Sequence, residues 1–418
     1  MRSPRDVAGA LMRRHERDRR QRSPEETMLR TAVLCLVAFG AVMVYSASSG
    51  TSALNGGGNG AQYLQRYLIS AVIGFAAMSY FAKNGMEAAK RFTPILLIVA
   101  FGGLFLVLVP GFGIEVNGAK RWIGAGPLQI QPSELAKLGL VLYAALLIAS
   151  KPARTRTLIG VRPLIVMAAG MAALIGLEPD MGTAIVITLT LGALLVVSGV
   201  APRHLALLVG SLIVVGFLFA MLEPYRRARL TAFLNPWQDA TGTGFQSVQA
   251  QIAIGSGGLF GVGIGESVQK LFYLPEAHTD MILAVIGEEL GLFGIGMVLS
   301  LYGMIAYAGL RTARRARDLY AKLIAAGITS VIVIQATVNF FAVLGIMPLT
   351  GVPLPFISYG NSNLVVLLSG MGLLINVAQS GGRARRAPPK LTVVEGAGRA
   401  SKPRPQTADR RRQKRSSA

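Results

Sequence analysis

The chain contains few charged residues for its length. Only 15% of its 418 residues are charged, against roughly 25% in soluble domains, which argues against an ordinary soluble fold. Acidic residues are the scarcer kind: 20 Asp and Glu stand against 42 Lys and Arg, so the formal net charge is +22. The basic residues fall in short clusters between apolar runs rather than along one folded face, which argues against nucleic-acid binding.

Cysteine and histidine are also nearly absent. The single cysteine, Cys35, excludes an intrachain disulfide, and its place inside an apolar run predicts a small, buried hydrophobic side chain. The three histidines, His15, His204 and His278, are far apart in sequence and lack the spacing of zinc ligands. We therefore predict no metal site built from protein side chains.

Apolar residues are abundant instead, at 52% of the chain, and the mean hydropathy is +0.51. They gather in runs close to the about 20 residues that cross a hydrocarbon core, which predicts an all-α polytopic membrane protein. The pair Glu178 and Asp180 flanks a proline, so we interpret 163–200 as two spans joined by a tight turn. The ten expected spans lie near residues 30–48, 64–82, 92–110, 134–150, 163–177, 182–200, 204–222, 280–309, 323–346 and 355–379.

The distribution of Lys and Arg predicts that both termini are cytoplasmic. In that orientation the cytoplasmic segments hold 34 of these residues and the outer segments eight, as the positive-inside rule requires. We expect a basic cytoplasmic tail at 1–29, with the first span kept as an uncleaved signal anchor. The membrane domain then covers 30–380, and a basic, disordered cytoplasmic tail covers 381–418.

Two extracytoplasmic loops, 111–133 and 223–279, are more polar than simple connections need. Loops of this length are usually functional or disordered, and the aromatic and apolar residues of the second favour a loop folded onto the outer mouth of the bundle. Its many glycines match no nucleotide-binding pattern. We expect them to allow close packing or re-entrant backbone.

Three cations are expected near the outer boundary. Lys120 and Arg121 lie in the first loop, and Lys137 lies just inside the fourth span, where Ser133 is expected to cap the helix and Glu134 to lie at its positive end. Together the cations suit a diphosphate group at the membrane surface. The structural alternative is a buried ion pair between Glu134 and Lys137, which share a helical face. Trp122 is either a substrate contact or an interfacial belt residue.

Asp280 is the candidate catalytic group. It stands where the eighth span enters the membrane from outside, so it is either a simple helix cap or a general base with a raised pKa. His278 is a weaker candidate for the same role. Glu288, two turns deeper, is expected to contact the helices that carry Gln335 and Asn339.

The last outer turn, 345–360, is rich in proline and glycine and is expected to interrupt the start of the final span; it contains Ser358, a further substrate-binding candidate.

Several motifs follow one another along the chain: Asn117-Gly118-Ala119-Lys120-Arg121-Trp122, Gln131-Pro132-Ser133-Glu134 with Lys137, Leu177-Glu178-Pro179-Asp180, Ile252 to Gly258, Leu274 to Asp280, Gly287-Glu288-Glu289-Leu290-Gly291 and Pro353 to Gly360. Together they resemble the SEDS family, the FtsW/RodA/SpoVE proteins that polymerise peptidoglycan glycan strands. The resemblance covers residues 30–380 and is closer to the division-type (FtsW) branch than to the elongation branch. One departure is Asn361-Ser362-Asn363, where the family usually has small residues.

The resemblance implies a ten-span fold in the bacterial plasma membrane whose outer cavity binds lipid II and the nascent glycan strand. In the family the residue matching Asp280 is taken as catalytic, and the one matching Trp122 matters for activity. Transfer would invert the sugar linkage and release undecaprenyl pyrophosphate, stabilised by the cations or by a divalent cation such as Mg²⁺ or Mn²⁺. The implied partners are a class B penicillin-binding protein (an FtsI-type transpeptidase) and other divisome proteins at the septum.

Two other functions fit the composition. A lipid II flippase would place polar groups near mid-membrane and expose them to each face in turn, whereas the candidate residues here gather at the outer face. A non-catalytic scaffold for division proteins would tolerate replacement of Asp280.

Overall fold

The computed structural model describes residues 23–386, except for 55–60, 117–118, 126–127, 154, 156, 223–226, 228–231 and 272. Most of both predicted tails therefore lies outside the described residues. The helices are α2 (Pro24–Leu54), α3 (Gln62–Leu108), α4 (Pro132–Ser150), α5 (Leu158–Leu177), α6 (Met181–Ser198), α7 (Pro202–Leu222), α9 (Phe245–Gly257), α10 (Ile282–Arg314), α11 (Leu319–Val343) and α12 (Asn361–Arg386), with a 3₁₀ helix, η2 (Pro236–Asp239).

Eight helices of the described chain are long and apolar enough to cross a membrane. One of them, α3, has 47 residues and contains non-helical backbone at Gly85, where two helices join across a kink. Its two halves correspond to the expected spans 64–82 and 92–110. The expected span 204–222 forms α7, which is not among the eight. The prediction of a polytopic helical membrane protein is confirmed.

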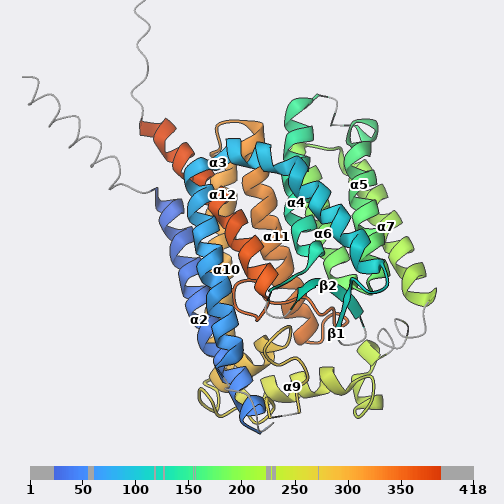
Figure 1. The fold of residues 1–418 in the computed structure, drawn as a ribbon, viewed down its shortest axis with the longest axis vertical. Helices are drawn as coiled ribbons and strands as arrows, with labels where there is room; N and C mark the ends of the chain where they lie inside the picture. Colours follow the sequence, from blue (N-terminus) through green and yellow to red (C-terminus); the bar gives the residue numbers. More distant parts are fainter. Residues whose placement is uncertain are drawn as a thin grey trace, which may run out of the picture.

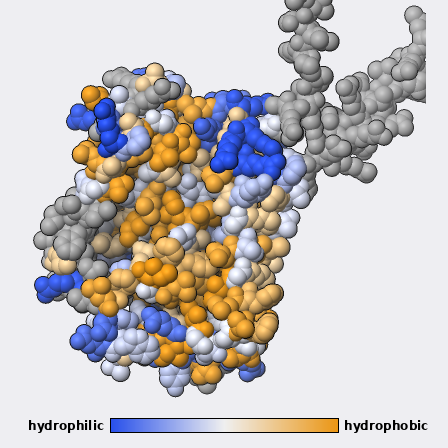
Figure 2. Space-filling view, turned by 180° about the vertical axis from the view of Figure 1, so that it is seen from behind, coloured by the Kyte–Doolittle hydropathy of each residue, from blue (hydrophilic) through white to orange (hydrophobic). Residues whose placement is uncertain are grey.

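The described chain begins and ends near one end of the bundle, and α9 and the strands lie at the other (Figure 1). At the first end Glu25, in the first turn of α2, pairs with Arg311 at 2.9 Å and also contacts Arg315. Figure 2 shows a broad hydrophobic surface on the flank, with hydrophilic residues gathered towards the two ends. This pattern is typical of a bundle surrounded by lipid.

The core lies where α10, α11 and α12 pack against α2 and α4. Nearly the whole of α11 is buried, which explains why its sequence is apolar on every side. The break at 178–180 is confirmed: α5 ends at Leu177, α6 begins at Met181, and the Asp180 carboxylate caps α6 by accepting from the Thr183 N–H at 3.1 Å.

Several details differ from the sequence-based expectations. The first outer loop forms a three-stranded antiparallel sheet, ordered β1 (Ile114–Val116), β2 (Ala119–Ala125) and β3 (Leu128–Ile130), where no strand was expected. Cys35 is exposed on the surface of α2 rather than buried, because its side of the helix faces outward from the bundle. α12 continues to Arg386, beyond the expected start of the tail at Gly381.

The start of α4 also differs. Its capping position is Gln131, Pro132 occupies the first turn, and no side-chain capping bond forms. Ser133 is already inside the helix and is buried with no hydrogen-bond partner for its hydroxyl, so the expected cap is wrong. A proline at the first helical position needs no N–H acceptor, which makes a hydroxyl cap less necessary there.

Candidate active site

Strand β2 carries three of the candidate residues. Side chains alternate along a strand, so Lys120 and Trp122 project to one face and Arg121 to the other. Lys120 is exposed, whereas Arg121 and Trp122 are half-buried. The side chain of Arg121 therefore lies on the opposite face of β2 from those of Lys120 and Trp122.

The Arg121 guanidinium is held by the turn between α5 and α6. Its Nε donates to the Glu178 carbonyl oxygen at 3.1 Å, and Nη2 donates to the Pro179 carbonyl oxygen. Two fixed carbonyls orient the planar guanidinium while leaving its charge uncancelled, since neither acceptor is a carboxylate. The turn thus positions a cation at the outer end of the bundle.

Glu178 itself is an unusual carboxyl group. Its side chain is only 1% exposed, and neither carboxylate oxygen has a hydrogen-bond partner. Burial, and to a smaller extent the nearby Asp180, raise the pKa of Glu178 to about 8, although the positive charge of Arg121 opposes both effects. At neutral pH this carboxyl is therefore mainly protonated. From the sequence, Glu178 was only a carboxylate beside the helix-breaking proline and a member of one family motif.

Asp280 lies two residues before α10 and does not act as its cap. The capping position is Met281, and no side-chain capping bond is made there. The Thr279 hydroxyl lies 3.2 Å from Asp280 Oδ1, and the Asn339 side-chain amide donates to the Asp280 carbonyl oxygen at 2.7 Å. α11 thereby fixes the backbone of the half-buried acid.

Asp280 and Arg121 both approach Gly351. A Cβ built on Gly351 would stand 3.9 Å from Asp280 Oδ2 and 3.9 Å from Arg121 Nη1. Gly351 has φ +70°, a conformation that favours glycine, so the backbone itself keeps a side chain out of this space. The structure therefore brings together one predicted acid and one predicted cation that are far apart in sequence.

Glu134 and Lys137 form a buried network instead of an open cation site. Lys137 Nζ lies 2.8 Å from Glu134 Oε2 and donates to the Gln335 side-chain oxygen at 2.6 Å. Both charged side chains are at most 2% exposed. This arrangement is the structural alternative recognised from the sequence. Convergence of Lys120 and Lys137 with Arg121 on one diphosphate stays a prediction.

His278 belongs to an aromatic group. Its ring centroid lies 4.4 Å from that of Tyr63 and 5.7 Å from that of Tyr359, and its carbonyl oxygen accepts from the Tyr359 N–H at 2.9 Å. Burial lowers the pKa of His278, although the negative charge of Glu276 opposes this. His278 therefore joins the Asp280 segment to the last outer turn by packing and by a backbone hydrogen bond.

The last outer turn is held by hydroxyl groups. The Tyr67 hydroxyl donates to the Phe356 carbonyl oxygen at 2.5 Å, and the Tyr302 hydroxyl donates to that of Pro355. Ser358 is buried, and its Oγ accepts from the Leu354 N–H at 2.8 Å. The structure gives Ser358 a contact that shapes the turn. As expected, the turn interrupts the final span, and α12 begins only at Asn361.

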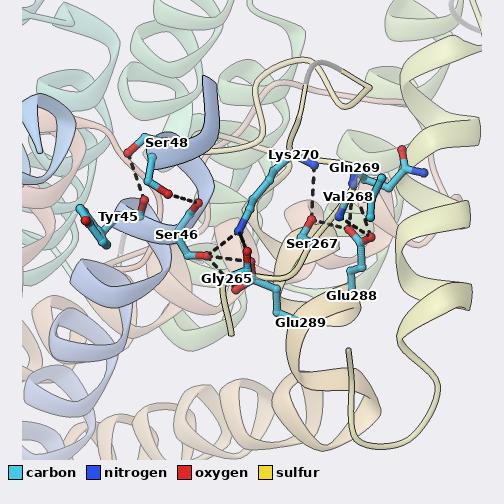
Figure 3. A network of polar contacts seen from close by, with 11 residues as sticks. Tyr45, Ser46, Ser48, Gly265, Ser267, Val268, Gln269, Lys270, Glu288 and Glu289 are labelled. Carbon is cyan, nitrogen blue, oxygen red and sulfur yellow. Dashed lines mark hydrogen bonds and ion pairs between the residues drawn. The ribbon is translucent and has the colours of Figure 1, made fainter. Parts of the chain in front are cut away.

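Two adjacent carboxylates of α10 hold the second outer loop (Figure 3). Glu288 accepts from the Ser267 hydroxyl and from the Val268 N–H at 3.0 Å. Glu289 pairs with Lys270 at 2.8 Å and accepts from the Ser46 hydroxyl of α2 at 2.7 Å.

The expected contact of Glu288 with the helices of Gln335 and Asn339 is wrong, because the loop folds back onto α10 and reaches this carboxylate first. Gln335 and Asn339 instead donate to the carbonyl oxygens of Pro353 and Val352, and so support the turn that contains Gly351.

Glycines allow the second loop to approach α10 closely, as expected. A Cβ on Gly257 would stand 1.9 Å from the Gly287 carbonyl oxygen, and one on Gly261 would stand 2.1 Å from that of Glu289. α10 has non-helical backbone at Gly291, with φ +65°. At this kink, the Val262 and Gly263 N–H groups donate to the Glu288 and Glu289 carbonyl oxygens at 3.0 Å each.

Among the described residues no group of three or more His, Cys, Asp or Glu side chains gathers that could hold a metal ion. Glu178 and Asp180 are neighbours, but one Asp180 oxygen caps α6 and the other accepts from Gln131. These residues do not form a divalent-cation site as they stand, so no catalytic step is assigned to a metal.

The chain is similar to known proteins of one family. The family model described as "Cell cycle protein", FtsW/RodA/SpoVE, matches residues 26–382. A probable peptidoglycan glycosyltransferase FtsW from Trichlorobacter lovleyi is 39% identical, covering 84% of this chain and 93% of the relative. Stage V sporulation protein E from Bacillus subtilis is 37% identical, covering 86% and 98%.

A solved structure is similar as well. It comes from work on the structural coordination of polymerization and crosslinking by a peptidoglycan synthase complex. It matches with a TM-score of 0.69 at 29% identity, covering 84% of this chain and 97% of that chain. The family match spans nearly the whole described bundle, including both outer loops and the last turn. The chain therefore belongs to the FtsW/RodA/SpoVE family.

Proposed function

We propose that this protein is a peptidoglycan glycosyltransferase that joins lipid II units into a glycan strand at the outer face of the plasma membrane. Relatives that carry this activity in their names align over most of the chain. The multi-span fold is suited to a lipid-linked substrate, because such a donor stays in the membrane while its sugar and diphosphate lie at the surface.

The observation that carries the mechanism is that Asp280 Oδ2 and Arg121 Nη1 both lie close to Gly351. One is an acid that does not cap its helix, and the other is a cation held only by backbone carbonyls. A glycosyl transfer to a hydroxyl group needs a base at the acceptor and a positive charge at the departing diphosphate. Asp280 can act as the base, and Arg121 can supply the positive charge.

In the proposed step, the Asp280 carboxylate removes the proton from the 4-hydroxyl of the acceptor sugar. The acceptor oxygen attacks the anomeric carbon of the donor from the face opposite the diphosphate, so the α linkage becomes a β-1,4 linkage. The bond from that carbon to the diphosphate oxygen breaks, and undecaprenyl pyrophosphate leaves with the electron pair. Arg121 stabilises the charge that develops on it. One base suffices because a diphosphate is a good leaving group.

Substrate contacts by Lys120, Trp122 and His278 belong to the same proposal. The exposed Lys120 and the half-buried Trp122 share one face of β2, where a cation and an indole can contact a diphosphate and a sugar. Glu134, Lys137 and Ser358 are then positioning groups, since each is buried and bonded within the protein.

We also propose a class B penicillin-binding protein of the FtsI type as partner, acting with other divisome proteins at the septum. The similar solved structure comes from a peptidoglycan synthase complex that both polymerises and crosslinks. Relatives named FtsW and stage V sporulation protein E have comparable identity, so a sporulation site is the alternative location.

The test uses the full-length protein with its transpeptidase partner in lipid vesicles and labelled lipid II. We expect the wild type to produce glycan chains and Asp280→Asn to produce none. Glu115→Gln is the matched control, because Glu115 is an exposed carboxylate at the same outer face. Chain formation by Asp280→Asn would exclude Asp280 as the base. Transfer of lipid II across the vesicle membrane without polymerisation would favour a flippase, and neither activity in the wild type would favour a scaffold.

A further inference from the structure

The second outer loop contains an apolar segment (residues 258–265) with no charged residue. Its larger side chains are exposed: Leu259 by 65%, Phe260 by 82% and Ile264 by 59%. Such an exposed, charge-free stretch is unfavourable in water and favourable against hydrocarbon.

The depth of this segment follows from its bonds to α10. The Leu292 and Phe293 N–H groups donate to the Gly258 and Leu259 carbonyl oxygens, at 3.0 and 3.1 Å. At 1.5 Å per residue, Phe293 lies roughly 27 Å along α10 from Arg311, a basic residue of the last turn at the end that we place in the cytoplasm. The hydrocarbon core is about 30 Å thick, so Leu259 lies near its outer edge.

Backbone N–H groups of the segment form hydrogen bonds with α10, as a hydrocarbon environment requires. Unpaired N–H and C=O groups are costly in hydrocarbon. The Val262 and Gly263 N–H groups donate to the Glu288 and Glu289 carbonyl oxygens, whose usual partners within α10 are displaced by the kink at Gly291. The kink thus provides acceptors at the depth where the segment needs them.

Two charged residues follow the segment closely: Glu266 is exposed, whereas Lys270 is withdrawn into the protein. Lys270 is only 4% exposed, and its ammonium is shared among Glu289, Ser46 and the Gly265 carbonyl oxygen (Figure 3). On the neighbouring surface of α10, the side chains of Leu292 and Phe293 are 56% and 70% exposed. The apolar surface therefore continues from the segment onto the helix.

We propose that the apolar segment is an interfacial anchor that inserts Leu259 and Phe260 among the acyl chains of the outer leaflet. The occupant of this surface is lipid, because the surface continues onto the membrane-facing side of α10. The anchor goes beyond the proposed activity: it holds the loop that leads to Asp280 at a fixed height relative to the membrane surface.

The test labels single cysteines with a nitroxide in the full-length protein in lipid nanodiscs. Cys35→Ala removes the only native cysteine. Phe260→Cys and Leu259→Cys are the test variants. Leu299→Cys, on an exposed position of α10, is the lipid reference, and Thr241→Cys, in the exposed turn after η2, is the water reference. Accessibility to oxygen, which partitions into lipid, is compared with accessibility to a water-soluble nickel chelate.

We expect the labels at 259 and 260 to resemble the one at 299, with an oxygen-to-nickel accessibility ratio several-fold above that at 241. Labels that resemble the one at 241 would overturn the proposal, since the segment would then lie in water. Labels shielded from both reagents would also overturn it, because protein would cover the surface. The measurement is independent of glycan synthesis, so its failure leaves the proposed enzymatic activity intact.

Discussion

The Asn363 side-chain amide donates a 2.8 Å hydrogen bond to Glu134 Oε2, joining the start of α12 to the start of α4. Its neighbour Ser362 accepts from the Gln131 N–H and donates to the Gln129 carbonyl oxygen, each at 3.1 Å. The unusual Asn361-Ser362-Asn363 sequence therefore contacts the first outer loop and the buried ion pair of Glu134 and Lys137.

This contact predicts that Asn363→Asp is more damaging than Asn363→Ala. The alanine variant loses one bond to a charged group, which costs about 1.5–3 kcal/mol. The aspartate variant instead places a second buried carboxylate beside Glu134, with only Lys137 to balance both. Thermal unfolding in detergent measures both losses, and lowering the pH should recover part of the aspartate variant's stability. Equal stability of the two variants would contradict the assignment.

Glu178 predicts a pH dependence of stability. Because its pKa is about 8 in the folded protein and 4.5 in the reference state, the folded form holds a proton that the unfolded form releases. The resulting stabilisation is present below pH 4.5 and is lost as pH rises towards 8, at no more than about 1.4 kcal/mol per pH unit. Glu178→Gln removes this dependence.

The measurement for Glu178 is the melting temperature between pH 5 and about 8. The advantage of Glu178→Gln over the wild type should grow as the pH rises. Asp239→Asn is the control: hydrogen bonds from Thr243 lower the pKa of Asp239, so its titration lies below this window. An advantage that stays constant over the window would show that Glu178 titrates normally.

The pair of Lys270 and Glu289 predicts non-additive mutations. Lys270→Met or Glu289→Gln alone leaves a buried group without its partner, at a cost of about 3–5 kcal/mol for breaking a buried pair. The double variant should lose less than the two single losses combined. Arg30→Met, which breaks the more exposed pair with Glu26, should cost about 1 kcal/mol or less. Hydrogen exchange of residues 258–271 measures loop release, and additive losses would argue against the coupling.

Two glycines of α9 provide a matched comparison. Gly257→Ala places a Cβ 1.9 Å from the Gly287 carbonyl oxygen, so α9 must move away from α10, at an expected cost of about 1–3 kcal/mol. A Cβ on Gly255 meets no atom within 4 Å, and Gly255→Ala should stabilise the helix by about 0.5–1 kcal/mol. Thermal unfolding separates the two. Tolerance of alanine at 257 would mean that the close approach is not required.

The spans could be predicted because the hydrocarbon core imposes a length and an apolar composition on each helix. The tight turn at 178–180 and the interrupted start of α12 were predictable for a similar reason, since proline cannot continue a helix. The short strands of the first loop gave no such signal. They are held by pairing with one another and by contact with α3 and α4.

Partners of the polar residues were harder to predict. Glu288 was expected to contact other spans, yet its partners come from a loop that folds back onto its own helix. For Lys137 the sequence left open a diphosphate contact or an ion pair with Glu134, and the structure shows that pair together with a bond to Gln335 that the sequence did not indicate. A sequence gives the position of a charge along the chain, but the group that neutralises it depends on which segments become neighbours.

Hydropathy and charge act locally on each segment, so the sequence alone indicated a helical membrane protein and predicted that its polar loops lie on the outer side. It also identified Asp280 and Arg121 as candidate groups from their places at the outer boundary. The folded arrangement of the bundle brings both groups close to Gly351 and buries Glu178 with neither carboxylate oxygen hydrogen-bonded. These are contacts between segments far apart in the chain, and packing of the whole bundle sets them.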